Sequence, residues 1–276
     1  MVQIKKFLFP VLAVMFSCLL GTVGMISQDV PVYIWIQNVV SSIMLTVITV
    51  FLCNIKIRLN DQVMVFISCL LLGLTFFQEG YDGVHRWILG SLYISSILLP
   101  ITVIFIDRIL KQGNVIFAFI SIVFISVILF LQPDAAQLTG FSAAMLVCLF
   151  SNHIFKSMKL ILCGILVVLT ALSWIFVDHL PAVSYVEGIL TMLSEVSFIL
   201  YCLGLLAVFL LPIPFVACSS RKNKRLSVSI MLYYWGITIS AFFGNFPVPV
   251  MGYGISPIIG YFMVLLWQVN QGDEHD

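Results

Sequence analysis

Long apolar runs alternate with short polar segments along nearly the whole chain. A helix needs roughly 20 apolar residues to cross the hydrocarbon core of a bilayer. Each run meets or approaches this length, so the pattern predicts an all-α polytopic membrane protein with ten transmembrane helices. The eighth run is long enough to tilt or to begin outside the membrane. The predicted helices are residues 7–26, 32–54, 62–78, 88–106, 114–131, 137–155, 160–177, 187–215, 226–246 and 255–270.

Composition excludes a soluble globular protein. Hydrophobic residues make up 62% of the chain and charged residues 9%, and the mean hydropathy is +1.16. No linker, repeat or low-complexity segment separates the runs, so we expect residues 1–276 to form a single transmembrane domain. The net charge of +1 gives no reason to expect a nucleic acid partner.

The basic residues lie in alternate gaps between the apolar runs. If ten helices alternate in direction, every Lys and Arg except Arg86 falls on one side of the membrane. The positive-inside rule makes that side cytoplasmic and places both termini there. The cytoplasmic basic residues are Lys5, Lys6, Lys56, Arg58, Arg108, Lys111, Lys156, Lys159, Arg221, Lys222, Lys224 and Arg225. The charged residues of the outer segments are Asp29, Glu79, Asp82, Arg86, Asp134, Asp178 and Glu187.

Two outer segments are candidates for chemistry. Arg86 stands on the side that the positive-inside rule disfavours, and a guanidinium beside Trp87 suits an anionic partner such as a lipid phosphate. The structural alternative is that Arg86 pairs with Asp82 or Glu79 while Trp87 belongs to the interfacial aromatic belt.

The second segment, residues 244–257, contains three prolines and three glycines and cannot form a regular helix. Irregular backbone at membrane depth is tolerated only where protein or water surrounds it. We therefore expect this segment to dip back and pack against a polar cavity. The alternative is a tight connector between two helices.

Four segments resemble motifs of the SEDS family, the RodA-, FtsW- and SpoVE-like polytopic proteins. Residues 83–90 resemble its G-x-R-R-W-I-x-L-G motif, and residues 132–134 match its [EQ]-P-D-x-G-T motif. Residues 180–195 resemble the loop Y-L-P-E-x-x-x-D-F-I-F-A-V-x-x-E-E-L-G, and residues 246–256 resemble L-P-L-P-F-x-S-Y-G-G-S-S. The order of the motifs, the ten helices and the inside termini agree with this family.

The resemblance implies a glycosyltransferase that polymerises peptidoglycan strands from undecaprenyl-pyrophosphate-linked lipid II in cell-wall elongation or division. It implies a multi-pass protein of the bacterial inner membrane, in contact with membrane lipids and the lipid-linked glycan precursor. A class B penicillin-binding protein, the transpeptidase, is the implied protein partner. No cofactor is identified in the sequence, although the resemblance allows a divalent metal ion.

The resemblance also nominates site residues. The catalytic Asp of the family has no identical match here, and counting back from Glu195 puts Glu187 in its place as the base. The longer Glu side chain shifts the carboxylate by roughly an ångström. The expected substrate-binding residues are Arg86, Trp87, Asp134, Glu195, Pro247, Pro249, Tyr253, Gly254 and Ser256.

Two of these carboxylates have structural alternatives. On a continuous eighth helix, Glu195 would lie about 12 Å deeper than Glu187, at ~1.5 Å per residue, and would face the same cavity. Burial would then raise its pKa, and the alternative is a neutral carboxyl bonded to a neighbouring helix. Asp134 follows Pro133 and could instead serve as a helix cap or turn residue.

Departures from the family motifs keep other functions open. The outer loop at residues 178–186 is much shorter than in typical members, and residues 95–98 replace the family's Q-P-S-E. A non-catalytic SEDS-like scaffold, or a lipid-binding partner of a cell-wall enzyme, is the first alternative. A flippase for a lipid-linked precursor is the second. It would need acids at several membrane depths, and only Glu195 is expected within the membrane.

Overall fold

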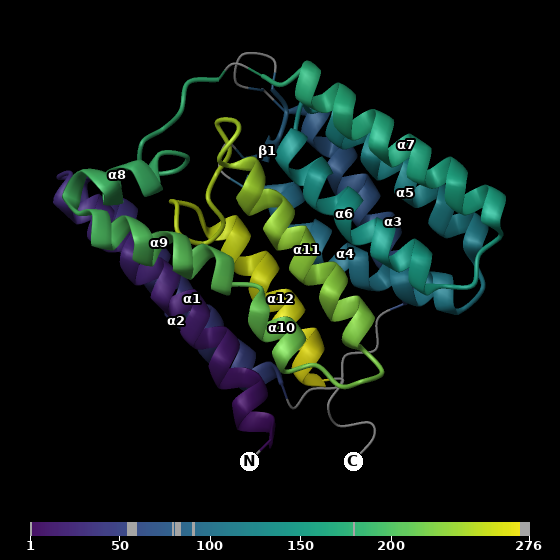
Figure 1. Cartoon of the computed structure of the whole chain (residues 1–276), viewed down its shortest axis with the longest axis horizontal. Helices are drawn as coiled ribbons and strands as arrows, with labels where there is room; N and C mark the ends of the chain where they lie inside the picture. The colour runs from purple at the N-terminus through teal and green to yellow at the C-terminus, as the bar shows by residue number, and fades with distance from the viewer. Residues whose placement is uncertain are drawn as a thin grey trace. The chain divides into compact units, whose positions relative to one another are not determined.

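The computed structural model describes residues 2–53, 60–78, 80, 84–89, 92–178 and 180–270. Within these ranges the chain is helical apart from connecting segments and one two-stranded sheet. The chain divides into two compact units (Figure 1). Unit 1 comprises residues 1–56, 180–221 and 237–276, and unit 2 comprises residues 57–179 and 222–236. Several residues used in the sequence predictions lie outside the described ranges, namely Lys56, Arg58, Glu79, Asp82, Gly83 and Gly90.

Unit 1 is built around the first helix. Helix α1 packs against α2, α8, α9 and α12, and apolar side chains such as Leu20, Met25 and Leu193 form its core. The beginning of α1 and the end of α12 lie toward the same end of this unit (Figure 1). Its helices are α1 (Val2–Ser27), α2 (Val32–Leu52), α8 (Ile189–Val196), α9 (Phe198–Leu210), α10 (Ile213–Ala217) and α12 (Ile255–Asn270).

Unit 2 is a bundle with a short hairpin at one end. Helix α3 packs against α4 and α5, α4 also packs against α6, and α7 covers α5 and α6. Helix α11 (Lys224–Ser240) starts in unit 2, and its last residues belong to unit 1. The other elements are α3 (Asp61–Leu74), the 3₁₀-helix η1 (Thr75–Phe77), β1 (Trp87–Ile88), β2 (Leu92–Tyr93), α4 (Ile94–Lys111), α5 (Val115–Leu131), α6 (Ala135–Ser151) and α7 (Lys156–Ile175).

The predicted all-α class is confirmed. Among the described residues, three helices are both long and apolar enough to cross a membrane, namely Phe7–Ser27, Val32–Leu52 and Lys156–Ile175. Shorter apolar helices coincide with further predicted runs at Asp61–Phe77, Val115–Leu131, Ala135–Ser151, Phe198–Leu210 and Ile255–Asn270. The number of spans and the side of the termini stay predictions.

The predicted start of the fourth helix at residue 88 is wrong. An antiparallel hairpin pairs Trp87 with Tyr93 and Ile88 with Leu92, and α4 starts only at Ile94. Leu89, at the turn, has a φ of 55°, which is incompatible with a right-handed helix. The hairpin places the residues just after Arg86 beside the start of α4.

The predicted eighth helix, residues 187–215, is also broken into shorter pieces. Ser197 is extended, with φ −166° and ψ 140°, and its hydroxyl accepts the Ile199 N–H to cap α9. A second break follows Leu210, where Pro212 precedes α10. The predicted start of this run at Glu187 is early as well, because α8 begins at Ile189.

Two acidic residues near helix ends on the predicted cytoplasmic side, Asp61 and Asp107, are buried and form ion pairs. Asp61, at the start of α3, pairs with Arg108 Nε at 3.3 Å. Asp107 pairs with Lys111 at 2.5 Å and accepts a hydrogen bond of 2.9 Å from Asn152. Both acids are more than nine-tenths buried. The Asp61–Arg108 ion pair links α3 to the end of α4, and the hydrogen bond from Asn152 to Asp107 links the end of α6 to α4.

A close approach inside unit 1 leads to a stability prediction. A Cβ added to Gly21 of α1 would lie 2.2 Å from the Met251 carbonyl oxygen, whereas a Cβ on Gly164 of α7 meets nothing within 4 Å. Gly21→Ala is therefore expected to lower the free energy of unfolding by about 1–3 kcal/mol, the usual cost of overpacking. Gly164→Ala is the matched control, with an expected gain of at most about 1 kcal/mol from helix propensity. Unfolding in detergent micelles measures both, and equal stability of the two variants would contradict the close approach.

Candidate functional site

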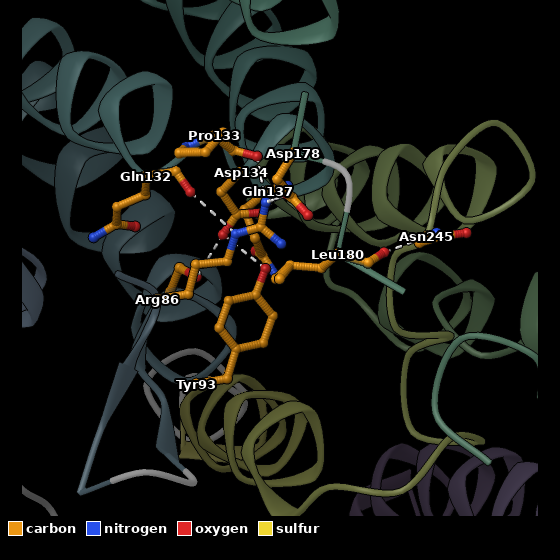
Figure 2. Close-up of polar contacts among 10 residues, drawn as sticks. Arg86, Tyr93, Gln132, Pro133, Asp134, Gln137, Asp178, Leu180 and Asn245 are labelled. Atoms are coloured by element: carbon orange, nitrogen blue, oxygen red, sulfur yellow. Dashed lines mark hydrogen bonds and ion pairs between the residues drawn. The ribbon is translucent and has the colours of Figure 1, made fainter. Parts of the chain in front are cut away.

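Arg86 is buried in unit 2 and binds three acceptors. Its Nε donates to the Gln132 carbonyl at 3.1 Å, and its Nη2 donates to the Pro133 carbonyl and to Asp178 Oδ2 (Figure 2). Arg86 is only 4% exposed, and its ion-pair partner Asp178 follows α7. The planar guanidinium fork suits such a set of divergent acceptors. Arg86 thereby fastens the α5–α6 turn to the segment after α7.

Asp178 is a partner of Arg86 that the sequence did not predict. The predicted alternative partners, Asp82 and Glu79, lie outside the described residues, so pairing with them stays a prediction. Trp87 is half-buried on β1, and its ring lies 6.2 Å from the Tyr93 ring between centroids.

Asp134 caps α6 from a fully buried position. Its Oδ1 accepts the Gln137 N–H at 3.3 Å, as expected of the structural alternative. Its Oδ2 accepts hydrogen bonds from the Tyr93 hydroxyl at 2.7 Å and from the Ser95 hydroxyl at 3.1 Å. Contact of Asp134 with a substrate stays a prediction.

Polar side chains of two further elements extend this network. The amide of Gln132 donates to Thr75 Oγ1 at 2.7 Å and to the Leu72 carbonyl at 3.1 Å, at the end of α3. The amide oxygen of Gln137 accepts the hydroxyl of Tyr233 on α11. We call the whole set the Arg86 cluster, consisting of Arg86, Tyr93, Ser95, Gln132, Asp134, Gln137, Asp178 and Tyr233. Figure 2 labels all of these except Ser95 and Tyr233.

Electrostatics within the Arg86 cluster keep the cation charged. Burial alone would lower the pKa of Arg86, but Asp134, Tyr93 and Asp178 together raise it above its ordinary value. Burial raises the pKa of Asp134, and the Arg86 charge and the hydrogen bonds to its carboxylate only partly offset this. The guanidinium is therefore held in its charged form beside the carboxyl groups of Asp134 and Asp178.

The Pro- and Gly-rich segment forms a second polar site, in unit 1. We call residues 245–254 the Pro/Gly loop; its Val248, Val250 and Met251 are almost completely buried. Asn38 of α2 donates to the Gly252 carbonyl at 2.8 Å and accepts the Gly254 N–H at 3.1 Å. The loop thus packs against protein, and its predicted packing against a polar cavity stays a prediction.

The Pro/Gly loop is joined to the turn that precedes α8. The Tyr253 N–H donates to the Tyr185 carbonyl at 2.8 Å, and the two rings meet edge-on with centroids 5.9 Å apart. A Cβ on Gly252 would lie 2.3 Å from the Val186 carbonyl oxygen, so only glycine allows this approach. The Pro/Gly loop therefore packs directly against the turn that contains Glu187.

Glu187 lies in this turn. It is half-buried, and its Oε2 accepts the Val183 N–H at 2.8 Å. Its own N–H bonds the Val183 carbonyl at 3.0 Å, and Gly188 separates it from α8. The carboxylate is consequently oriented by local backbone rather than by a first helical turn.

Glu195 does not lie in a buried cavity. It is exposed on α8, where its Oε2 accepts a hydrogen bond of 2.8 Å from Gln28. The expectation of burial is wrong because the break at Ser197 makes α8 a short helix with its own polar face. A role for Glu195 in substrate binding stays a prediction.

The nominated residues thus gather in two sets. Arg86, Trp87 and Asp134 belong to unit 2. The members from unit 1 are Glu187, Glu195, Pro247, Pro249, Tyr253, Gly254 and the buried Ser256 at the start of α12.

Several polar residues at these two sites were not predicted as site residues from the sequence. They lie within or beside apolar runs, and a polar side chain in such a run is itself a signal of a functional or packing role. These residues are Gln37, Asn38, Tyr93, Ser95, Gln137 and Tyr233.

In the part of the chain that the structure describes, no group of three or more His, Cys, Asp or Glu side chains could hold a metal ion. The divalent ion allowed by the family resemblance has no ligand set there. We therefore assign no residue to a metal.

Comparison with solved structures identifies the fold. The chain matches the crystal structure of the rod shape determining protein RodA from Thermus thermophilus with a TM-score of 0.71 and 18% sequence identity. The match covers 98% of this chain and 97% of that chain. No protein-family model matches the sequence, and no curated protein matches it. The protein therefore has a SEDS-like, all-α fold. More specifically, the fold is similar to that of RodA, a member of the family that the sequence motifs resemble.

Proposed function

We propose that the protein polymerises peptidoglycan strands from lipid-linked precursor at the outer face of the bacterial inner membrane. The RodA-like fold, which extends over 98% of the chain, supports a role in cell-wall synthesis. The observation that carries the proposal is the half-buried Glu187 carboxylate, held by the Val183 N–H on a turn packed against the Pro/Gly loop.

In the proposed reaction, Glu187 acts as general base. It takes the proton from a sugar hydroxyl of the acceptor, whose oxygen then attacks the anomeric carbon of the donor sugar. The bond between this carbon and the pyrophosphate oxygen breaks, and undecaprenyl pyrophosphate leaves. A carboxylate can serve as the base only if it is ionised and reachable from water, and partial exposure of Glu187 allows both.

Substrate contacts are proposed within each unit separately. In unit 1 they are made by Glu195, Pro247, Pro249, Tyr253, Gly254 and Ser256. In unit 2 they are made by Arg86, Trp87 and Asp134, with Arg86 binding a phosphate oxygen in exchange for one of its present acceptors. A class B penicillin-binding protein is the proposed protein partner.

The proposed membrane topology has ten spans, with both termini in the cytoplasm. Reporters fused at Arg108, Lys156 and residues 221–225 are expected to read cytoplasmic, because the positive-inside rule retains basic loops there. Reporters at Asp134, Asp178 and Met251 are expected to read external. Paired alkaline phosphatase and GFP fusions measure both sides, and one inverted pair would refute the count of ten.

The proposed activity is tested with purified protein and lipid II. Incubation followed by sizing of the products should give glycan strands, and a sample without protein should give only monomer. Monomer alone with the folded wild-type protein, with and without its transpeptidase partner, would contradict the proposal.

A second candidate function is a non-catalytic SEDS-like scaffold, or a lipid-binding partner of a cell-wall enzyme. It is favoured by the buried ion pair of Arg86, which links the α5–α6 turn to the segment after α7 as a structural element would. In this case the protein would co-purify with a cell-wall enzyme, and the Glu187→Gln variant would retain this association and full biological activity.

A further inference from the structure

We propose that Asn38 of α2 is a positioning residue for the turn that carries Glu187. This inference rests on the proposed function, because it names a residue that orders the proposed base from a distance. Asn38 does not contact Glu187. It acts through the Pro/Gly loop, which lies between α2 and the turn.

The first step is that Asn38 hydrogen-bonds the backbone of the Pro/Gly loop. The side chain is 2% exposed and binds the peptide groups on both sides of Tyr253. Its Nδ2 donates to the Gly252 carbonyl at 2.8 Å, and its Oδ1 accepts the Gly254 N–H at 3.1 Å. An amide offers both a donor and an acceptor, whereas an ionised carboxylate offers only acceptors and Leu offers neither.

The second step is a hydrogen bond between the side chain of Tyr253 and α2. Its hydroxyl donates to Gln37 Oε1 at 2.9 Å, so two successive residues of α2 bind the same short stretch of the loop. Gly254 has a φ of 140°, a conformation that glycine favours and that the bond from Asn38 stabilises.

The third step leads from the loop to the turn. The Tyr253 N–H donates to the Tyr185 carbonyl, and Gly252 is in close contact with the Val186 carbonyl. Glu187 is the next residue in the chain. A shift of the loop would therefore move the backbone of the turn and, with it, the Glu187 carboxylate.

The burial of Asn38 supports a specific role. A buried amide is costly unless it is hydrogen-bonded, and Asn38 makes its two side-chain hydrogen bonds to the loop backbone. The Asn38 side chain therefore stabilises the loop backbone rather than the backbone of α2.

Hydrogen–deuterium exchange in lipid nanodiscs tests the coupling without any assay of activity. In Asn38→Leu, exchange is expected to rise about three- to tenfold at Tyr253 and Gly254, and also across residues 183–188. Val40→Leu is the matched control, because Val40 is 44% exposed on the same helix and should change neither segment. Faster exchange in the loop alone, or in neither segment, would overturn the proposal.

Two further variants keep the test valid if Asn38→Leu fails to fold. Asn38→Asp retains an acceptor for the Gly254 N–H and should have an intermediate effect. Gln37→Leu removes only the contact with the Tyr253 hydroxyl and should loosen the same two segments more weakly. An unchanged turn in both variants would overturn the coupling.

Kinetics with lipid II separate a failure of this inference from a failure of the proposed function. If Asn38 positions the base, kcat should fall about tenfold to a hundredfold in Asn38→Leu, with KM nearly unchanged and Asn38→Asp in between. An unchanged kcat in an active protein would overturn the positioning role. An inactive wild-type protein would refute the proposed function, and the exchange data would still decide the coupling.

Discussion

Replacing Asp178 by alanine is expected to destabilise the folded protein by about 3–5 kcal/mol, because a buried charge loses its ion partner. Arg86 is 4% exposed and Asp178 is 8% exposed, so water cannot replace the lost carboxylate without opening the Arg86 cluster. The two carbonyls that also bind Arg86 carry no compensating charge. Unfolding in detergent micelles measures the loss.

Two control variants make this prediction specific. Asp178→Asn keeps an oxygen acceptor but removes the charge, so its loss of stability should be smaller than that of Asp178→Ala. Asp29→Asn removes a carboxylate from an exposed position and should change the unfolding free energy by less than about 0.5 kcal/mol. Equal stability of the Asp178→Ala and Asp29→Asn variants would show that the ion pair contributes nothing.

The predictable part of the fold is the part set by local composition. Apolar runs and basic gaps give the class, and most helices lie close to their predicted positions. The break within the eighth run was missed because it falls at Ser197, where no proline or glycine marks it in the sequence. Pro212 was a visible signal for the second break, since proline cannot donate a helical hydrogen bond.

Partners distant in the chain could not be predicted. Arg86 pairs with Asp178, which lies in a loop four predicted helices further along, so local spacing gave no reason to join them. The same holds for Asn38 and Gly252. Asn38 lies in the second predicted helix, and Gly252 lies between the ninth and the tenth. Sequence motifs named the Pro/Gly loop as a site, but only the fold shows which helix orders it.

The largest functional effect is expected for Glu187→Gln. Loss of the general base should lower polymerisation about 10²- to 10⁴-fold. The glutamine amide oxygen can still accept the Val183 N–H, so the turn should keep its conformation while the side chain can no longer take a proton. Product sizing after incubation with lipid II measures the activity, and an unchanged unfolding temperature confirms that the variant is folded.

Glu195→Gln is the matched control for this last prediction. Glu195 is exposed and bonded to Gln28, and a glutamine can still accept that bond, so activity should fall only slightly. Glu187→Asp tests geometry, because it retains a carboxylate but withdraws it by roughly an ångström, which should lower activity up to about a hundredfold. Full activity of Glu187→Gln would remove the proposed base and leave the non-catalytic scaffold as the better account of Glu187 and its turn.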